Sequence, residues 1–187
     1  MIRAVLDACV IYPPSLRDLL MRVAARGLYR PHFTEAIHTE WIRNVKANNP
    51  EITLDRLDRT RLFMNQISPD CLISNYERHI SYLNLPDIDD RHVLPAAIEA
   101  NAKFIVTFNL GDFPELELNK YNVTAQHPDI FLSVMFENHT ARVLDAMRNH
   151  RVSLNNPPKT PKEYLATLRA NSLTQLAQHA EAFAHSL

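Results

Sequence analysis

Glycine is almost absent from this chain of 187 residues, which contains only Gly27 and Gly111. Loops that cradle nucleotide phosphates need several closely spaced glycines, so a P-loop and a dinucleotide-binding loop are excluded. Long hydrophobic runs are missing as well, since no apolar segment approaches the ~20 residues that span a bilayer. The first residues also lack the basic and long apolar regions of a signal peptide. We therefore expect a cytoplasmic protein that does not enter a membrane.

Cysteine is scarce, and neither sign of charge dominates. Cys9 and Cys71 both lie in apolar, strand-like stretches, which favours buried free thiols in a reducing compartment. The chain has 20 Lys and Arg against 21 Asp and Glu, which gives a net charge of −1. Proteins that hold nucleic acid through phosphate neutralisation alone carry a basic excess. Any nucleic acid must therefore be held locally, by a few cations near a cleft and by a metal ion.

Strand-like and helical segments alternate over the first two thirds of the sequence. Residues 2–6 and 103–107 are apolar throughout, as central parallel strands are, and weaker strands are predicted at 71–73 and 122–125. Apolar residues at helical spacing predict helices over 15–26, 34–45, 54–67 and 91–101. Ser15 is predicted to cap the first of these helices, and Gly27 to follow its last turn. This alternation predicts βαβ units, with right-handed crossovers and a parallel sheet.

The pattern changes to helix alone beyond Pro128. A second helical segment is predicted to begin at Thr160-Pro161-Lys162-Glu163, with Thr as N-cap, Pro at the first helical position and Glu at the third. A modest apolar stripe follows in this segment. We predict one domain over residues 1–127 and a helical C-terminal extension over residues 128–187 that packs on it.

Polar side chains follow two of the predicted strands. Asp7 comes directly after the strand 2–6, while Asn109 and Asp112 follow the strand 103–107. In an open parallel sheet, ligands bind outside the carboxyl ends of the strands. Taken singly, each of these residues is better explained as a turn or cap residue. Together they form an ordered pattern that predicts a site at this edge of the sheet.

Two further acids belong to the same pattern. Asp90 stands at the start of the predicted helix that leads into the strand 103–107, where it could also serve as a cap. Glu40 lies beside Trp41, at the edge of the apolar face of its helix, although a helical Glu is most often a solvated charge. Several carboxylates in one cleft repel one another unless a cation compensates them. Oxygen ligands without paired His or Cys indicate Mg²⁺ or Mn²⁺ rather than zinc.

At this point the residues resemble those of the PIN domain family. Four segments carry the resemblance, and they occur in the family's order: VLDACVI at 5–11, TEW at 39–41, DIDDRHVLPAA at 87–97 and IVTFNLGDFP at 105–114. The last two are the most specific, and the resemblance spans roughly residues 1–127. A subgroup with the DRHVL and TFNL segments and a helical C-terminal extension is similar to this chain up to its end.

The resemblance implies a three-layer α/β/α fold, a Rossmann-like parallel sheet, and a ribonuclease that depends on Mg²⁺ or Mn²⁺. Many prokaryotic members are VapC-type toxins that a small VapB-type antitoxin protein holds in check. It implies hydrolysis of RNA phosphodiester bonds by a metal-activated water. Two alternatives stay open: a metal-dependent nuclease that acts on DNA, and a catalytically silent binding module of the same fold. A homo-oligomer is compatible with each of these functions.

The family's site residues carry over onto five positions of this chain. Asp7, Glu40 and Asp90 match the first three acids, while Asn109 occupies the place where a fourth acid often stands. Asp112 is offset by one residue from a further acid in that turn. Either Asn109 ligates weakly, or Asp112 takes over, or three carboxylates suffice. We prefer Asp112 as the fourth metal ligand, because the flexible Leu110-Gly111 pair precedes it.

Four other residues complete the predicted site. Thr107, at the end of its strand, is expected to orient a ligand or a water. Arg43, Lys46 and Arg91 flank the acidic segments and could bind substrate phosphates. Ordinary helix-surface charge explains these three cations equally well.

Overall fold

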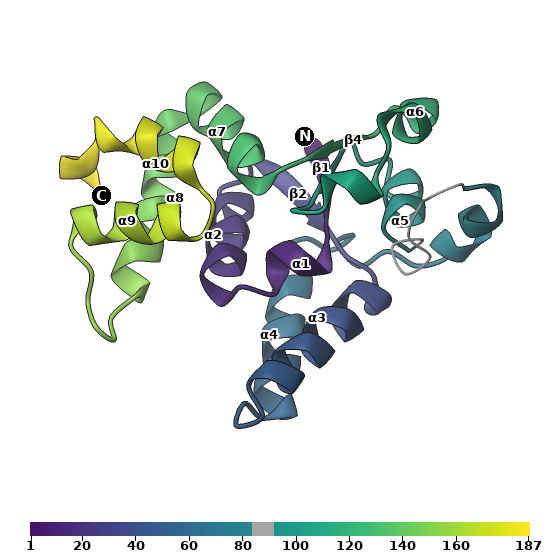
Figure 1. Cartoon of the computed structure of the whole chain (residues 1–187), viewed down its shortest axis with the longest axis horizontal. Helices are drawn as coiled ribbons and strands as arrows, with labels where there is room; N and C mark the ends of the chain where they lie inside the picture. The colour runs from purple at the N-terminus through teal and green to yellow at the C-terminus, as the bar shows by residue number, and fades with distance from the viewer. Residues whose placement is uncertain (84–91) are drawn as a thin grey trace.

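A parallel β-sheet forms the centre of the molecule. The structure, a computed structural model, describes residues 1–83 and 92–187 (Figure 1). The strands within these residues are ordered β2-β1-β3-β4 and all neighbours are parallel. They are β1 (Ile2–Leu6), β2 (Tyr29–His32), β3 (Phe104–Val106) and β4 (Thr124–Gln126). The predicted strands at 2–6, 103–107 and 122–125 are thus confirmed, with bounds that differ by one or two residues.

Strand β2 was not predicted from the sequence. It contains Arg30 and Pro31, and proline is disfavoured in strands because it has no N–H to donate. The strand forms because it pairs on one side with β1, whose last three residues are fully buried, in a register that places Pro31 opposite Ala4. On its other side, a single bridge joins Phe33 to Leu72. The strand expected at 71–73 is reduced to that bridge, so this prediction was wrong in extent.

Helices cover both faces of the sheet. The segments that connect the strands contain α1 (Ala8–Ile11), α2 (Pro14–Ala25), α3 (Glu35–Asn48), α4 (Leu54–Asn65), η1 (Tyr76–Tyr82), α5 (Val93–Glu99), η3 (Leu110–Asp112), α6 (Glu115–Leu118) and η4 (Asn119–Tyr121). The chain passes from β1 to β2 on one side and then to β3 on the other side of β1. Right-handed crossovers in opposite directions place α2 and α5 on opposite faces. The predicted three-layer α/β/α fold is confirmed.

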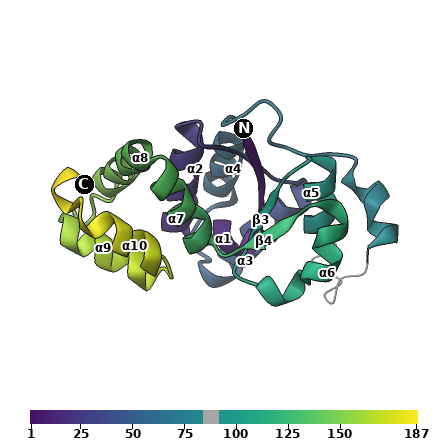
Figure 2. The same ribbon diagram turned by 90° about the horizontal axis from the view of Figure 1, so that it is seen from above.

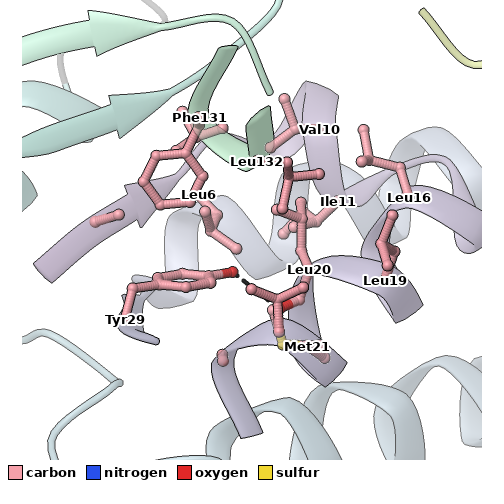
Figure 3. Packing of buried hydrophobic residues seen from close by; sticks show 14 of the residues in the cluster. Leu6, Val10, Ile11, Leu16, Leu19, Leu20, Met21, Tyr29, Phe131 and Leu132 are labelled. Carbon is pink, nitrogen blue, oxygen red and sulfur yellow. Dashed lines mark hydrogen bonds between the residues drawn. The ribbon is translucent and has the colours of Figure 1, made fainter. Parts of the chain in front are cut away.

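The core on one face joins the sheet to both early and late helices. Tyr29 of β2 is fully buried, and its hydroxyl donates a hydrogen bond to the carbonyl of Leu20 in α2, at 3.0 Å (Figure 3). The ring of Phe131, from a C-terminal helix, meets Tyr29 edge-on with 5.0 Å between centroids. Such pairs add about 0.5–1.5 kcal/mol to the hydrophobic burial itself. Residues far apart in the sequence therefore share one core.

The C-terminal part of the chain is entirely helical in its regular structure. It consists of α7 (Pro128–Asn138), α8 (Thr140–Ser153), α9 (Pro161–Ala170), α10 (Thr174–Glu181) and η5 (Ala184–Ser186), which gather at one end of the molecule beside α2 (Figure 2). The capping box predicted at Thr160 and Glu163 is confirmed by both of its hydrogen bonds. Asp129 of α7 accepts hydrogen bonds from two backbone N–H groups at the start of α10. The division at residue 127 stays a prediction.

Two predicted helix starts need correction. Helix α2 begins at Pro14, so Ser15 lies inside its first turn and does not cap it. Proline at the first helical position is favourable, because its missing N–H would have no helical partner there. Gly27 follows the helix with φ +68°, as expected for a C′ glycine. Helix α5 begins at Val93, and Pro95 therefore lies in its first turn, where it removes no helical hydrogen bond.

No helix in the described part of the chain has the length and hydropathy needed to cross a bilayer.

Candidate active site

The sheet topology defines where a ligand can approach. Strands β1 and β3 are neighbours in the sheet. After β1 the chain first forms β2 on one side of β1, and only then crosses to form β3 on the other side. A crevice opens outside the carboxyl ends of two such strands. Asp7 directly follows β1 and Thr107 directly follows β3. The two residues therefore stand side by side at the carboxyl ends of the neighbouring strands.

The Asp7 carboxylate is fixed in place by Thr107. Its Oδ2 accepts a hydrogen bond of 2.6 Å from the Thr107 hydroxyl, and its own N–H donates to the carbonyl of Val106 at 3.1 Å. Asp7 is only 2% exposed. It also occupies the N-cap position of α1, yet its side chain makes no capping hydrogen bond. The simple explanation of Asp7 as a cap therefore fails, because its carboxylate is used across the two strand ends.

The backbone of the following turn fixes the Thr107 hydroxyl. The N–H of Asn109 donates to Thr107 Oγ1 at 2.9 Å. Since that oxygen accepts from the turn, its own hydrogen is left to point at Asp7. Thr107 is fully buried. The hydroxyl thus holds the Asp7 carboxylate in one orientation. The role predicted for Thr107 in orienting a ligand or a water stays a prediction.

Cys9 is a further member of this cluster that the sequence analysis did not assign to the site. Its thiol donates to Asp7 Oδ2 at 3.1 Å and lies 3.4 Å from Thr107 Oγ1. The N–H of Phe108 donates to the same sulfur at 3.3 Å. Burial, followed by the neighbouring Asp7 charge, raises the pKa of the Cys9 thiol to about 12. The thiol is therefore neutral at physiological pH and acts as a second hydrogen-bond donor to Asp7.

Glu40 lies on α3, the helix that packs against α1. Its side chain is 30% exposed, and its Oε2 lies 3.5 Å from Nε2 of His92. His92 is the N-cap residue of α5 and follows the segment that carries Asp90 and Arg91. Asp90 and Arg91 themselves lie outside the described residues, so their predicted roles stay predictions. The proximity of His92 to Glu40 was missed, because the two residues are far apart in the sequence and only the tertiary fold brings them together.

Asn109 and Asp112, the two candidate metal ligands in the turn after Thr107, differ in exposure. Asn109 is exposed, whereas Asp112 is half-buried within η3. Within the described residues, no hydrogen bond links either side chain to Asp7. Over 1–83 and 92–187, no three His, Cys, Asp or Glu side chains converge in a way that could hold a metal ion. The choice between Asn109 and Asp112 stays open.

The predicted substrate-binding cations also differ from one another. Lys46 donates hydrogen bonds to the carbonyls of Pro50 and Ile52, the latter at 2.9 Å, and thereby closes the turn between α3 and α4. Arg43 is exposed on α3. A role for either residue in substrate binding stays a prediction. The ammonium group of Lys46 already donates hydrogen bonds within the turn between α3 and α4.

The donor atoms at this edge suit a hard divalent cation. Asp7 and Glu40 offer carboxylate oxygens, and Thr107 offers a hydroxyl oxygen. Magnesium and manganese prefer such oxygen ligands in proteins. With Oδ2 of Asp7 held by Thr107 and Cys9, Oδ1 is the oxygen left to meet a ligand. The chemistry of these residues therefore fits the predicted metal.

Comparisons with known proteins find matches for both parts of the chain. Residues 3–111 match the model of the PIN domain, and residues 128–182 match the model of the VapC50 C-terminal domain. A protein of Mycobacterium tuberculosis (strain ATCC 25618 / H37Rv), named "Putative ribonuclease VapC50", is 40% identical over 82 residues. That alignment covers 42% of this chain and 47% of the relative, so the chain matches about half the relative's length. No solved structure matches.

Proposed function

Because the chain belongs to the PIN domain family, as its four sequence segments predicted, we propose that it is a metal-dependent nuclease that hydrolyses RNA phosphodiester bonds. One observation carries the proposal. The buried Asp7 carboxylate lies at the switch point of the sheet and is held at 2.6 Å by the Thr107 hydroxyl from the adjacent strand end. A carboxylate that only caps a helix needs no such support.

The residues around Asp7 divide into ligands and orienting groups. Asp7, Glu40 and Asp90 would hold Mg²⁺ or Mn²⁺, with Asp112 as the preferred fourth group. A divalent cation supplies Lewis-acid chemistry and neutralises charge on the reacting phosphate. Thr107 keeps the Asp7 carboxylate in one orientation, which leaves Oδ1 directed to the ligand. Orienting groups of this kind typically affect metal affinity or activity by about 10- to 100-fold.

The choice of RNA and of a partner rests on the comparisons. The similar M. tuberculosis protein is named as a ribonuclease of the VapC type, and the C-terminal helices match the VapC50 C-terminal domain. We infer that this chain is the toxin of a VapBC-type pair, and that a small antitoxin protein inhibits it. If so, the product of an adjacent small gene binds the purified chain and abolishes its RNA cleavage. An adjacent product with no effect on cleavage would contradict the toxin assignment.

Cleavage assays test the proposed activity directly. The wild type should cleave a single-stranded RNA oligonucleotide in Mn²⁺ or Mg²⁺, and a chelator should stop it. Asp7→Asn should lower cleavage at least about 100-fold, since losing an anionic ligand removes several kcal/mol of transition-state stabilisation. Its melting temperature should be unchanged or higher, because the substitution removes charge repulsion in the metal-free cleft.

Matched controls separate the three functions under comparison. Asp145→Asn makes the same chemical change on the exposed surface of α8, where the carboxylate pairs with Arg26, and should leave cleavage unchanged. Preferential cleavage of a DNA oligonucleotide of the same sequence would favour the DNA nuclease. No cleavage of either substrate, with folded protein and millimolar Mn²⁺, would favour the silent binding module.

A further inference from the structure

A pocket of about 380 Å³ lies between the start of α2 and the α3–α4 pair. It is lined by the turn from α1 to α2, by the end of α3 and by the first half of α4, elements that lie together in the lower part of Figure 1. The polar lining residues are Tyr12, Arg17, Asn49, Arg56 and Thr60. No Asp or Glu is among the described lining residues. The pocket therefore combines two cations and several neutral hydrogen-bonding groups.

Arg17 is the more deeply placed of the two cations. It donates one hydrogen bond, of 2.8 Å, from Nη1 to the carbonyl of Ile11, and its guanidinium carbon lies 4.8 Å from the centre of the Trp41 ring. Burial lowers the pKa of Arg17 to about 10, an effect that the nearby Asp18 charge partly offsets. The guanidinium is still charged at neutral pH, but it is incompletely solvated. An anion in the pocket would stabilise the charged guanidinium and so offset the effect of burial on its pKa.

Neighbouring arginines are neutralised, whereas the two pocket arginines are not. On α4, Arg59 pairs with Asp55, and Arg61 pairs with Glu35 of α3. Among the described residues, neither Arg17 nor Arg56 takes part in an ion pair within 4.0 Å. Arg56 is exposed at the mouth of the pocket. The described lining of the pocket therefore holds two guanidinium groups outside ion pairs and no carboxylate, although the whole chain has a net charge of −1.

We propose that Arg17 and Arg56 bind a phosphate group of the RNA strand, at a subsite separate from the Asp7 centre. The identity of this ligand rests on the proposed nuclease function. Guanidinium groups bind phosphate oxygens in a bidentate manner, and a lysine cannot reproduce that geometry. Helix α1 begins directly after Asp7 and ends directly before the lining residue Tyr12, so one short helix, about 6 Å long, separates Asp7 from this side of the pocket.

Substitution of Arg56 tests the subsite without disturbing the core. Full-length wild type and Arg56→Gln are titrated with a fluorescent single-stranded RNA oligonucleotide in the presence of chelator, and electrophoresis verifies that the RNA stays intact. Arg56→Gln should weaken binding about five-fold at 0.1 M salt and reduce the slope of log K against log salt by about 0.7. Arg59→Gln removes the same charge one turn along α4 but outside the pocket, and should change binding less than about two-fold.

Arg17→Lys provides an independent variant that keeps the charge. It should weaken RNA binding while leaving the salt slope close to that of the wild type, because only the bidentate geometry is lost. If Arg17→Lys does not fold, the RNA titration of Arg56→Gln alone tests the subsite. Equal RNA affinity and equal salt slope for wild type and Arg56→Gln would overturn the proposal, as would the absence of any RNA binding by the wild type.

A poly-glutamate peptide distinguishes a phosphate ligand from an acidic protein partner. Weaker binding of that peptide by Arg56→Gln, with RNA binding unchanged, would also overturn the subsite. These measurements involve no turnover. A wild type that binds RNA in the predicted way but never cleaves it would therefore count against the proposed nuclease function and not against the phosphate subsite.

Discussion

Two buried polar clusters in this molecule use similar side chains at very different places. At the strand ends, the Asp7 carboxylate is bound by the Thr107 hydroxyl. At the junction between α2, α8 and α9, the fully buried His150 contacts Tyr164 Oη through Nδ1 at 2.9 Å and Ser15 Oγ through Nε2 at 3.4 Å. Both clusters join segments that are about 100 or more residues apart. Only the first lies at a topological switch point of the sheet.

The second cluster shows why residue types alone do not make an active site. Ser15, His150 and Asp18 are the residue types of a hydrolytic triad, and Asp18 Oδ2 lies 3.9 Å from His150 Nε2. In a triad, however, the Ser and the Asp occupy opposite nitrogens of the imidazole. Here both face Nε2, while Nδ1 is occupied by Tyr164. The cluster therefore fastens the C-terminal helices to α2 and has no catalytic arrangement.

We expect the junction between α2, α8 and α9 to lose stability at acidic pH. Burial lowers the pKa of His150 from 6.5 to about 4, and the nearby Asp18 charge only partly opposes this. Between these values the unfolded chain binds a proton that the folded chain does not, so stability falls as the pH falls through this window. We expect His150 to contribute a loss of about 3 kcal/mol between pH 7 and pH 4.

Denaturant unfolding of two variants isolates this contribution. His150→Gln should flatten the pH dependence of the unfolding free energy in the acidic window. His185→Gln, at an exposed position in η5, should retain the wild-type dependence. If His150→Gln and the wild type lose the same stability on acidification, the histidine does not control the junction.

Thr107 provides a sharper test of the strand-end cluster. Thr107→Val removes the hydroxyl and keeps the shape, so Asp7 loses its strongest orienting hydrogen bond. We expect RNA cleavage to fall about 10- to 100-fold and the Mn²⁺ concentration for half-maximal rate to rise. Thr107→Ser restores a hydroxyl and should recover most of the activity. Equal rates for the Val and Ser variants would show that Thr107 only packs.

The smallest expected effects distinguish Asn109 from Asp112. If Asp112 is the fourth ligand, Asp112→Asn should raise the Mn²⁺ requirement several-fold, and Asn109→Asp should change it little. If Asn109 holds the ligand position, Asn109→Asp should lower the Mn²⁺ requirement and Asp112→Asn should be mild. No change in either variant would indicate a site that works with Asp7, Glu40 and Asp90.

The sequence predicted those parts of the structure that depend on local signals. Apolar strands followed by polar residues placed Asp7 and Thr107 at the same edge, and the Thr160 capping box marked the start of α9. Strand β2 was missed because its local composition disfavours a strand, and only pairing with β1 stabilises it. The contact of Cys9 with Thr107 and that of His150 with Ser15 were missed because the partners lie 98 and 135 positions away. Such contacts have no signature in the residues nearby.

Calorimetric titration of Mn²⁺ into the wild type and into Asp7→Asn tests the central claim most directly. The claim is that the cluster at the strand ends holds a divalent cation through Asp7, whereas the helical junction serves only the fold. The wild type should bind one Mn²⁺ per chain, and Asp7→Asn should bind it at least about ten-fold more weakly, because an amide offers no anionic oxygen. Mn²⁺ binding of equal affinity in both proteins, or none in the folded wild type, would contradict the account.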